Sequence, residues 1–285
     1  MLTPGHHMAP INDLQLGYTV AGKGPLLFIV APGWGIGSTY LQRGMAALSA
    51  NFTTVVIDPR GNGRSSRPSD ETDMGSAAMA HDIDQLRQYL GLETIDLMGH
   101  SNGGAIAIGF AEAYAPHCRK LVLIGSQLIG FSAGEATQEF LMKGMDDPRY
   151  RDAVGYSGLA FPETDEAFTQ RVQDMLPLFF YDPEKGVPLV LKMMDGLAAA
   201  YAFHAQRVAD GLPGADQTAD LGRIEAETLI MVGRHDWICP LPVSERLHAG
   251  IASSRLTVFE RTGHFPWLEA PQRFFDEVTQ FLKPF

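Results

Sequence analysis

The sequence predicts an α/β fold in which helices cover both faces of a mostly parallel central sheet, with a helical cap domain inserted into the chain. Short, continuously apolar runs, typical of strands buried on both faces, alternate with segments of helical periodicity. This alternation stops at residue 127, gives way to helical patterns alone until about residue 218, and then resumes. We therefore expect a core formed by residues 1–126 and 219–285 and a cap formed by residues 127–218, since so long a strandless segment is not a plain connection.

The individual elements follow from these patterns. Apolar or alternating runs predict strands at 14–20, 26–30, 53–57, 94–98, 120–125, 228–232 and 256–259. Helical periodicity predicts core helices at 39–50, 75–90, 104–114 and 271–282, and cap helices at 164–181 and 188–209. Pro188 suits the first turn of the helix at 188–209, where no backbone N–H is needed.

The bulk composition limits the class of partner. A net charge of −11 over 285 residues would repel the phosphates of nucleic acids and anionic membranes, so we expect a small-molecule substrate and neither kind of partner. Cys118 and Cys239 lie far apart and indicate no disulfide framework. The N-terminus lacks the pattern of a signal peptide, and the longest apolar run, 26–31, is too short to span a bilayer. We expect a cytoplasmic protein, and the sequence leaves its oligomeric state open.

A serine lies at the turn between a predicted strand and a predicted helix. The motif Gly99-x-Ser101-x-Gly103 follows the strand-like run that ends at Met98 and precedes a helix-like segment. Close-packing glycines on either side allow a serine in such a sharp turn to adopt strained backbone geometry and to present its hydroxyl in a cleft. This context predicts that Ser101 is a nucleophile.

A serine nucleophile needs a histidine base and an acid that orients it, here in the chain order serine, acid, histidine. Asp236 follows the predicted strand at 228–232, and His264 follows the strand at 256–259. Because open α/β sheets bind ligands at the carboxyl ends of their strands, we expect both side chains at the edge that presents Ser101.

These motifs, in this order, resemble those of the α/β-hydrolase fold superfamily, in the branch of general serine hydrolases and prolyl-aminopeptidase-like enzymes with a helical cap. The resemblance covers nearly the whole chain and is carried by Asp58-x-Arg60-Gly61-x-Gly63-x-Ser65, Gly99-His100-Ser101-Asn102-Gly103-Gly104, Gly233-Arg234-His235-Asp236 and Gly263-His264-Phe265. It implies that Ser101 is the nucleophile, that His264 is the general base and then the acid, and that Asp236 fixes the imidazole tautomer.

The resemblance also implies an oxyanion hole made by the backbone N–H groups of Asn102 and Gly33. Alignment with the family's His-Gly-Gly-Pro-Gly loop gives Gly33 as the second donor; the family's His-Gly is Ala31-Pro32 here, and proline has no N–H. We name four candidates for contact with substrate, two beside these groups and two on a cap helix: Trp34, Phe265, Tyr201 and His204.

Three other functions remain open at this point. A prolyl-aminopeptidase would hold the substrate ammonium with cap carboxylates, for which Glu135, Glu139, Glu163 and Glu166 are available. A nucleotide-binding oxidoreductase would use the glycines of Gly33-x-Gly35-x-Gly37, followed by Asp58, although this spacing is imperfect. The same fold also supports lyases, cyclases and ligand receptors.

The sequence shows no spacing typical of a metal site, neither His-Glu-x-x-His nor Cys-x-x-Cys, and we predict no metal and no cofactor. The function that we expect is that of a serine hydrolase. It would cleave an ester, thioester, lactone or similar acyl bond of a small, largely apolar molecule through an acyl-Ser101 intermediate.

Overall fold

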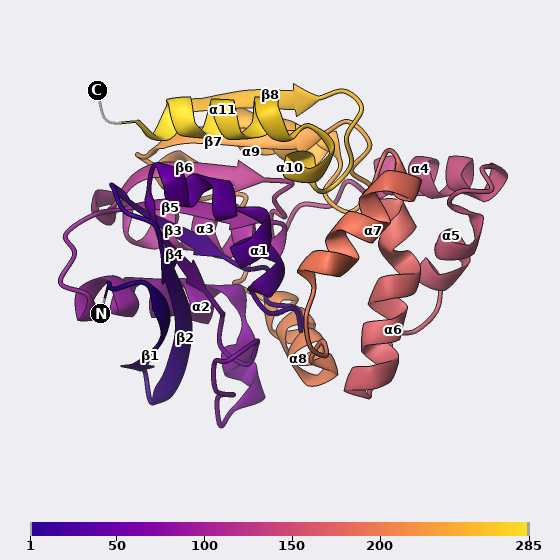
Figure 1. Ribbon diagram of the computed structural model, residues 1–285. Helices are drawn as coiled ribbons and strands as arrows, with labels where there is room; N and C mark the ends of the chain where they lie inside the picture. The colour runs from indigo at the N-terminus through magenta and orange to yellow at the C-terminus, as the bar shows by residue number, and fades with distance from the viewer. Residues whose placement is uncertain (1, 284–285) are drawn as a thin grey trace.

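One twisted sheet organises the molecule (Figure 1). The computed structural model describes residues 2–283, in which eight strands take the order β1-β2-β4-β3-β5-β6-β7-β8. Neighbouring strands from β4 to β8 are parallel, while β2 is antiparallel to both β1 and β4. The strands are β1 (Gly5–Ile11), β2 (Leu14–Ala21), β3 (Leu26–Val30), β4 (Thr53–Ile57), β5 (Ile95–His100), β6 (Cys118–Ile124), β7 (Glu227–Gly233) and β8 (Ser254–Phe259). The predicted α/β fold class is confirmed.

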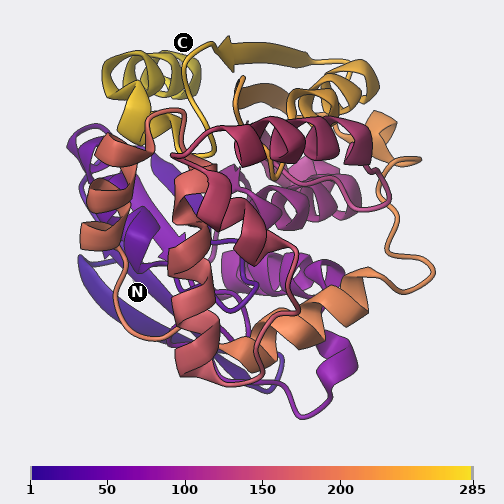
Figure 2. The ribbon, with the colours of Figure 1, turned by 90° about the vertical axis from the view of Figure 1, so that its right-hand side faces the viewer.

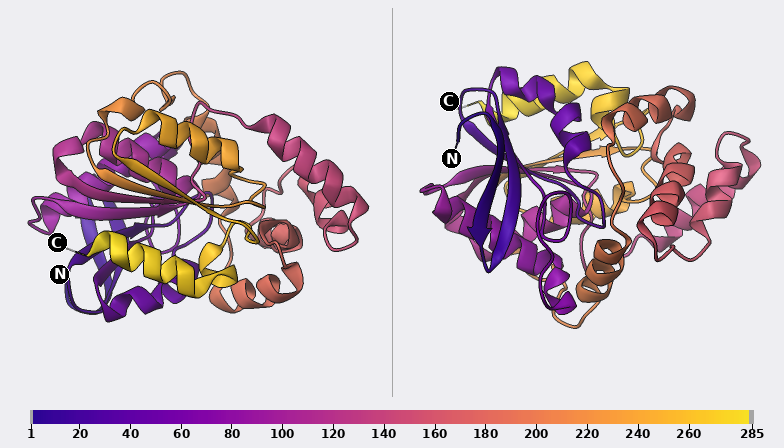
Figure 3. Two further views of the ribbon diagram at one scale, coloured as in Figure 1. Left: turned by 90° about the horizontal axis from the view of Figure 1, so that it is seen from above. Right: turned by 60° about the horizontal axis from the view of Figure 1, so that its bottom comes forward.

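Helices cover both faces of this sheet (Figure 3). One face carries α2 (Ser76–Tyr89), α3 (Asn102–Ala113) and α9 (Leu241–Gly250), and the other carries α1 (Thr39–Gly44), α10 (Pro266–Glu269) and α11 (Pro271–Leu282). Adjacent strand residues such as Phe28 and Ile29 belong to opposite cores, because successive side chains of a strand point to opposite faces. Short 3₁₀ turns lie at Ala46–Ala50, Glu71–Met74, Ala115–His117, Leu176–Phe179 and Leu221–Arg223.

Between β6 and β7 the described chain contains helices and no strand. The helices are α4 (Gly134–Asp146), α5 (Arg151–Ser157), α6 (Asp165–Met175), α7 (Pro183–Met193) and α8 (Ala200–Asp210). They lie beyond the carboxyl ends of the parallel strands, on the right in Figure 1 and facing the viewer in Figure 2. This group of helices, which we call the cap, therefore covers the sheet edge at which α/β folds bind ligands. Among residues 2–283, no helix has the length and apolar character needed to cross a bilayer.

Some elements differ from those expected. The single helix expected at 188–209 is two helices, and Pro188 lies inside α7, whose first turn contains Pro183 instead. The break has a physical cause: Gly196 has a φ of +73°, and the Ala199 N–H donates to the Gly35 carbonyl at 2.7 Å rather than to a helical partner. Likewise, the helices expected at 39–50 and 164–181 are α1 and α6, each followed by a 3₁₀ turn.

Candidate active site

Ser101 occupies a strained turn between β5 and α3. Its φ of 58° and ψ of −127° lie outside the regions that residues with a side chain favour. The chain packs so closely here that a Cβ on Gly99 would overlap the Gly103 carbonyl, and a Cβ on Gly103 would overlap the Val30 carbonyl. The Ser101 N–H donates to the Ile124 carbonyl at 3.0 Å, which fixes the turn to β6. The strand-to-helix turn predicted from the motif is therefore present.

Asp236 and His264 form a buried pair at the same edge of the sheet. Asp236 follows β7, His264 follows β8, and His264 Nδ1 lies 2.6 Å from Asp236 Oδ2. The other carboxylate oxygen, Oδ1, accepts the N–H groups of Ile238 at 3.0 Å and Cys239 at 2.9 Å. A carboxylate placed in this way accepts a hydrogen bond from the imidazole Nδ1–H, which leaves Nε2 free to take a proton from another group.

The end of β6 makes room for this pair. Gly125 follows β6 with a φ of +45°, and a Cβ at this position would lie 2.8 Å from Asp236 Oδ2 and 3.0 Å from His264 Nδ1. A side chain here would therefore push the carboxylate and the imidazole apart. The preceding residue, Ile124, accepts the Ser101 N–H through its carbonyl. Ile124 and Gly125 together therefore adjoin all three predicted catalytic residues.

The backbone of His264 is held from two sides. Its N–H donates to the Phe179 carbonyl of the cap at 2.7 Å, and its carbonyl accepts His100 Nε2 at 3.0 Å. The remaining His100 nitrogen, Nδ1, lies 2.8 Å from the Tyr40 hydroxyl. Burial, together with the neighbouring His264, holds the pKa of His100 well below its ordinary value, so this ring is neutral. The neutral His100 ring thus holds the backbone of His264 in place.

Ser101 and His264 line the same cavity, although no hydrogen bond joins the serine hydroxyl to the imidazole among residues 2–283. The Cys239 thiol lines the same cavity. Burial raises the pKa of Cys239 well above its ordinary value, so the thiol stays protonated and is a poor nucleophile. Contacts between a nucleophile and its base are often loose in a protein without substrate and tighten in the complex.

The loop after β3 lies beside Ser101 and is tied to the cap. Gly33 and Trp34 both have positive φ values, of +68° and 50°. The Trp34 N–H donates to Gln206 Oε1 of α8 at 2.7 Å, and Gln206 Nε2 donates to Asn102 Oδ1 at 2.6 Å. One buried glutamine therefore joins the loop to the start of α3. The N–H groups of Gly33 and Asn102 donate no hydrogen bond within the described chain, whereas that of Trp34 is used.

The cavity above Ser101 has a volume of about 560 Å³ and lies between the core and the cap. Two of the four residues predicted to contact substrate, Trp34 and Phe265, line it. The other two do not. The Arg67 guanidinium lies over the Tyr201 ring, 4.6 Å from the ring centroid. His204 Nε2 lies 3.1 Å from the Pro162 carbonyl oxygen.

The prediction for Tyr201 and His204 therefore has no support in the structure. It assumed one continuous helix, whereas the break before α8 changes which residues face inward. Phe203, between the two, lines the cavity instead, and Gln206 faces the loop after β3. The walls are largely aromatic and aliphatic, and no Asp, Glu, Lys or Arg of the described chain lines the cavity.

Sequence reasoning did not identify His100, Phe179 or Gln206 as functional. His100 adjoins the motif serine, which is a usable signal, but the contacts of Phe179 and Gln206 join segments far apart in the chain. Their roles follow only from the folded structure.

Comparison with known proteins agrees with this architecture. Residues 27–271 match the family model described as the alpha/beta hydrolase fold. Two relatives are similar in sequence. The 2-hydroxymuconate semialdehyde hydrolase of Pseudomonas sp. strain CF600 is 28% identical over 96% of this chain and 96% of its own. The 2-hydroxy-6-oxo-2,4-heptadienoate hydrolase of Pseudomonas putida is 29% identical over 84% of this chain and 81% of its own.

Two solved structures are similar in fold. An esterase from Exiguobacterium antarcticum has a TM-score of 0.73 at 21% identity, over 99% of this chain and 100% of its own. A meta-cleavage product hydrolase from Pseudomonas fluorescens IP01 has a TM-score of 0.71 at 22% identity, over 96% of each chain. The family model covers most of the chain, and the fold and the serine turn agree with it. The chain therefore belongs to the α/β-hydrolase fold family.

Proposed function

We propose that this hydrolase uses Ser101, His264 and Asp236 to cleave an ester, thioester, lactone or similar acyl bond of a small, uncharged and largely apolar molecule. The observation that carries the proposal is the buried Asp236–His264 pair, with its 2.6 Å contact, at the edge of the cavity that holds the strained Ser101. An orienting carboxylate, an imidazole and a serine in one cleft are the groups that acyl transfer to serine requires.

The chemistry would proceed in two stages. Ser101 Oγ attacks the substrate carbonyl carbon while His264 Nε2 takes the hydroxyl proton, and the imidazolium is stabilised by Asp236. The carbonyl oxygen becomes an oxyanion that the N–H groups of Gly33 and Asn102 stabilise. His264 then gives its proton to the leaving group, the acyl-Ser101 ester forms, and a water that His264 deprotonates releases the acid.

The walls of the cavity support an uncharged substrate. A prolyl-aminopeptidase would need a carboxylate to hold the substrate ammonium, yet Glu135, Glu139, Glu163 and Glu166 do not line the cavity of the described chain. A charged ligand without a partner in such a cavity would lose hydration without compensation. Aromatic and aliphatic walls instead gain free energy when they bury apolar ligand surface.

The nucleotide-binding alternative is disfavoured by how the loop after β3 packs. A Cβ on Gly33 would overlap Gln206, and one on Gly35 would overlap the Ala199 carbonyl, so cap atoms occupy the space beside both glycines. Asp58 is also used within the protein, because Oδ1 accepts the Ser38 N–H at 2.7 Å. Neither group is placed to hold a pyrophosphate or a ribose.

Hydrolysis of a carbon–carbon bond is a second candidate. Its support is that relatives of 28% and 29% identity are named as hydrolases of 2-hydroxymuconate semialdehyde and 2-hydroxy-6-oxo-2,4-heptadienoate. Both names denote a carboxylate, and the cavity described here offers no arginine or lysine to pair with one. This difference favours the ester-type substrate.

A comparison of substrates tests the proposal. We expect purified protein to hydrolyse p-nitrophenyl butyrate, and Ser101→Ala to lower kcat by about 10⁴-fold or more. Hydrolysis of 2-hydroxy-6-oxo-2,4-heptadienoate with a higher kcat/KM than any ester would support the second candidate instead. Wild-type ester turnover in folded Ser101→Ala protein would refute the proposed mechanism. Correct folding of the variant would be checked by circular dichroism and thermal unfolding.

A further inference from the structure

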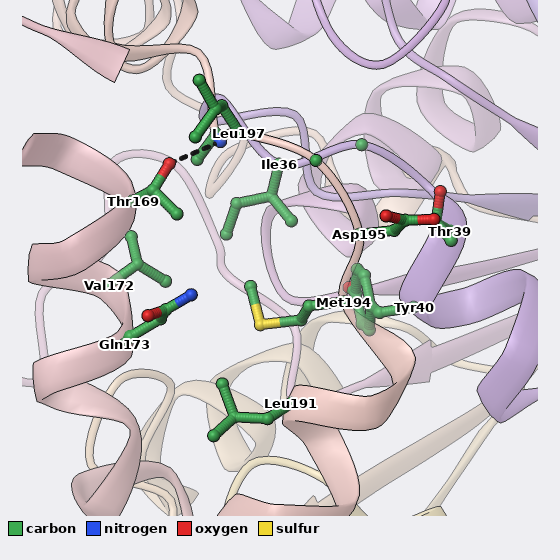
Figure 4. A pocket seen from close by; sticks show the side chains of 13 residues that line it. Ile36, Thr39, Tyr40, Thr169, Val172, Gln173, Leu191, Met194, Asp195 and Leu197 are labelled. Atoms are coloured by element: carbon green, nitrogen blue, oxygen red, sulfur yellow. Dashed lines mark hydrogen bonds between the residues drawn. The ribbon is translucent and has the colours of Figure 1, made fainter. Parts of the chain in front are cut away.

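A second cavity lies next to the one that contains Ser101. Its volume is about 260 Å³, and it lies between α6, the segment that joins α7 to α8, and the beginning of α1 (Figure 4). Neither the proposed catalytic residues nor the oxyanion loop glycine Gly33 line it. The catalytic chemistry described above therefore does not account for this space.

The two cavities share part of their lining. Ile36, Tyr40, Val172 and Met194 each line both cavities. Figure 4 shows the Met194 side chain between Val172 of α6 and Tyr40 of α1. The side chains of Ile36, Val172 and Met194 lack strong hydrogen-bonding groups, so van der Waals contact alone closes this part of the wall. Methionine is flexible and adapts readily to a new neighbour, so displacing Met194 would open a passage at low cost.

Hydrogen bonds join the backbone segments on both sides of this wall. Arg43 Nη1 donates to the carbonyls of Lys192 at 3.1 Å and Met193 at 3.3 Å, and Nη2 lies 3.1 Å from Asp195 Oδ2. On the other side, the Ala198 N–H donates to Thr169 Oγ1 at 2.8 Å (Figure 4). The frame can therefore stay in place while the side chains within it move.

The outer cavity suits an apolar chain. Leu191 and Leu197 line it and are 41% and 58% exposed, so a ligand that covers them would remove apolar surface from water. The charged group in its lining, Asp195, is paired with Arg43. An alkyl chain would cover this apolar surface without displacing an ion from water.

We propose that the outer cavity is a second subsite of the catalytic pocket and holds the distal end of an extended alkyl or acyl chain whose carbonyl lies at Ser101. Met194 and Val172 form the constriction through which the chain passes. The proposal rests on the proposed acyl hydrolysis and specifies its substrate as an ester whose alkyl or acyl chain extends beyond the catalytic cavity. Short esters would use the catalytic cavity only, whereas long esters would extend past Met194.

Kinetics with p-nitrophenyl acetate, hexanoate and decanoate test the subsite. Met194→Trp would fill the constriction, so we expect the ratio of kcat/KM for decanoate to kcat/KM for acetate to fall about tenfold or more. Met194→Ala would widen the constriction and raise the ratio of decanoate to acetate activity. Val172→Phe provides a second obstruction if Met194→Trp does not fold. Leu212→Trp, at an exposed position that lines neither cavity, is the matched control.

The same dependence on chain length in the wild type and in the folded Met194 and Val172 variants would overturn the subsite. A second measurement separates this failure from failure of the proposed hydrolysis. Binding of 1-decanol to Ser101→Ala protein, measured by calorimetry, requires no turnover, and we expect an added Met194→Trp substitution to weaken it about tenfold. If wild-type protein cleaves no ester but this binding behaves as expected, the hydrolysis is wrong and the subsite stands. If Ser101→Ala protein binds 1-decanol equally well with and without Met194→Trp, the subsite is contradicted but the hydrolysis is not.

Discussion

The carboxylate of Asp236 is saturated by donors that define its role. One oxygen accepts two backbone N–H groups and the other faces His264 Nδ1. Asp236→Asn would present an amide where the imidazole needs an acceptor, and the wrong tautomer would be favoured. We expect kcat for ester hydrolysis to fall about 10⁴-fold with little change in stability. The control is Asp84→Asn, at a buried carboxylate paired with Arg87 on α2; a kcat for Asp236→Asn within tenfold of this control would contradict the assignment.

Gln206 satisfies two buried polar groups at once, the Trp34 N–H and Asn102 Oδ1. Gln206→Leu would leave both without this partner, at a cost of about 1–3 kcal/mol for each buried group. We expect a lower free energy of unfolding in urea and a lower kcat, because the loop after β3 and the start of α3 are no longer fixed to each other. Gln170→Leu, at an exposed glutamine of α6, should change neither quantity appreciably. Equal stability of the two variants would refute this account of Gln206.

Individual site residues can be predicted from the sequence when they belong to local motifs. Ser101, Asp236 and His264 each follow a recognisable strand, so their positions at one edge of the sheet could be inferred before their contacts were known. Gln206 could not be inferred, because its partners Asn102 and Trp34 lie 104 and 172 positions away. Such contacts depend on how the cap packs on the core.

Helix α3, which follows Ser101, packs against the segment after β6 at a distance that only glycine allows. A Cβ on Gly104 would overlap Ser126, whereas a Cβ on Gly109 would meet Ala80 Cβ and Gln217 Nε2 at an ordinary 3.4 Å. We expect Gly104→Ala to destabilise the protein by about 1–3 kcal/mol through overpacking. Gly109→Ala, on the same helix, should be neutral or stabilising by up to about 1 kcal/mol, since alanine is the better helix former. Urea unfolding of both variants measures the difference, and equal effects would contradict the packing argument.

Elements buried in the core were easier to predict than those at the edges. The strands from β3 to β7 were predicted to within two residues because they are continuously apolar or nearly so. The exposed edge strand β1 was missed, and so was α4, which buries only Gly144 among its residues. The prediction of one helix at 188–209 was wrong because the apolar spacing continues across a break in the helix. Gly196 and the hydrogen bond to the Gly35 carbonyl impose this break.

Stability of the whole molecule should respond to Glu112 of α3. Burial, with a contribution from nearby Asp220, raises the pKa of Glu112 from 4.5 to about 8, and Oε1 has no hydrogen-bond partner in the described chain. Between pH 4.5 and about pH 8, Glu112 keeps its proton in the folded protein but has released it in the unfolded chain. Raising the pH through this window therefore favours unfolding, and the stability that the neutral carboxyl contributes is lost above about 8.

Glu112→Gln keeps this side chain neutral at every pH and should remove that dependence. Since Glu112 is only partly buried, we expect the variant to exceed the wild type by on the order of 1 kcal/mol near pH 9, or about 2–4 °C in Tm, and to match it near pH 5. Thermal unfolding across this range gives the comparison. The exposed Glu135→Gln is the control, and parallel pH curves for wild type and Glu112→Gln would exclude the proposed titration.

For the whole molecule, the sequence predicted the α/β architecture, because the alternation of strands and helices is a periodic pattern. The shape and charge of the cavity could not be predicted. They depend on which residue of each cap helix faces inward, as the positions of Phe203, Tyr201 and His204 show.

The most direct measurement of the central claim is covalent labelling by a fluorophosphonate, followed by mass mapping of the modified residue. We predict one modified site, Ser101, in wild-type protein, no labelling of Ser101→Ala, and much slower labelling of folded His264→Ala, since the imidazole activates the hydroxyl. Folded wild-type protein that stays unlabelled at Ser101, or that is labelled equally fast without His264, would contradict the account.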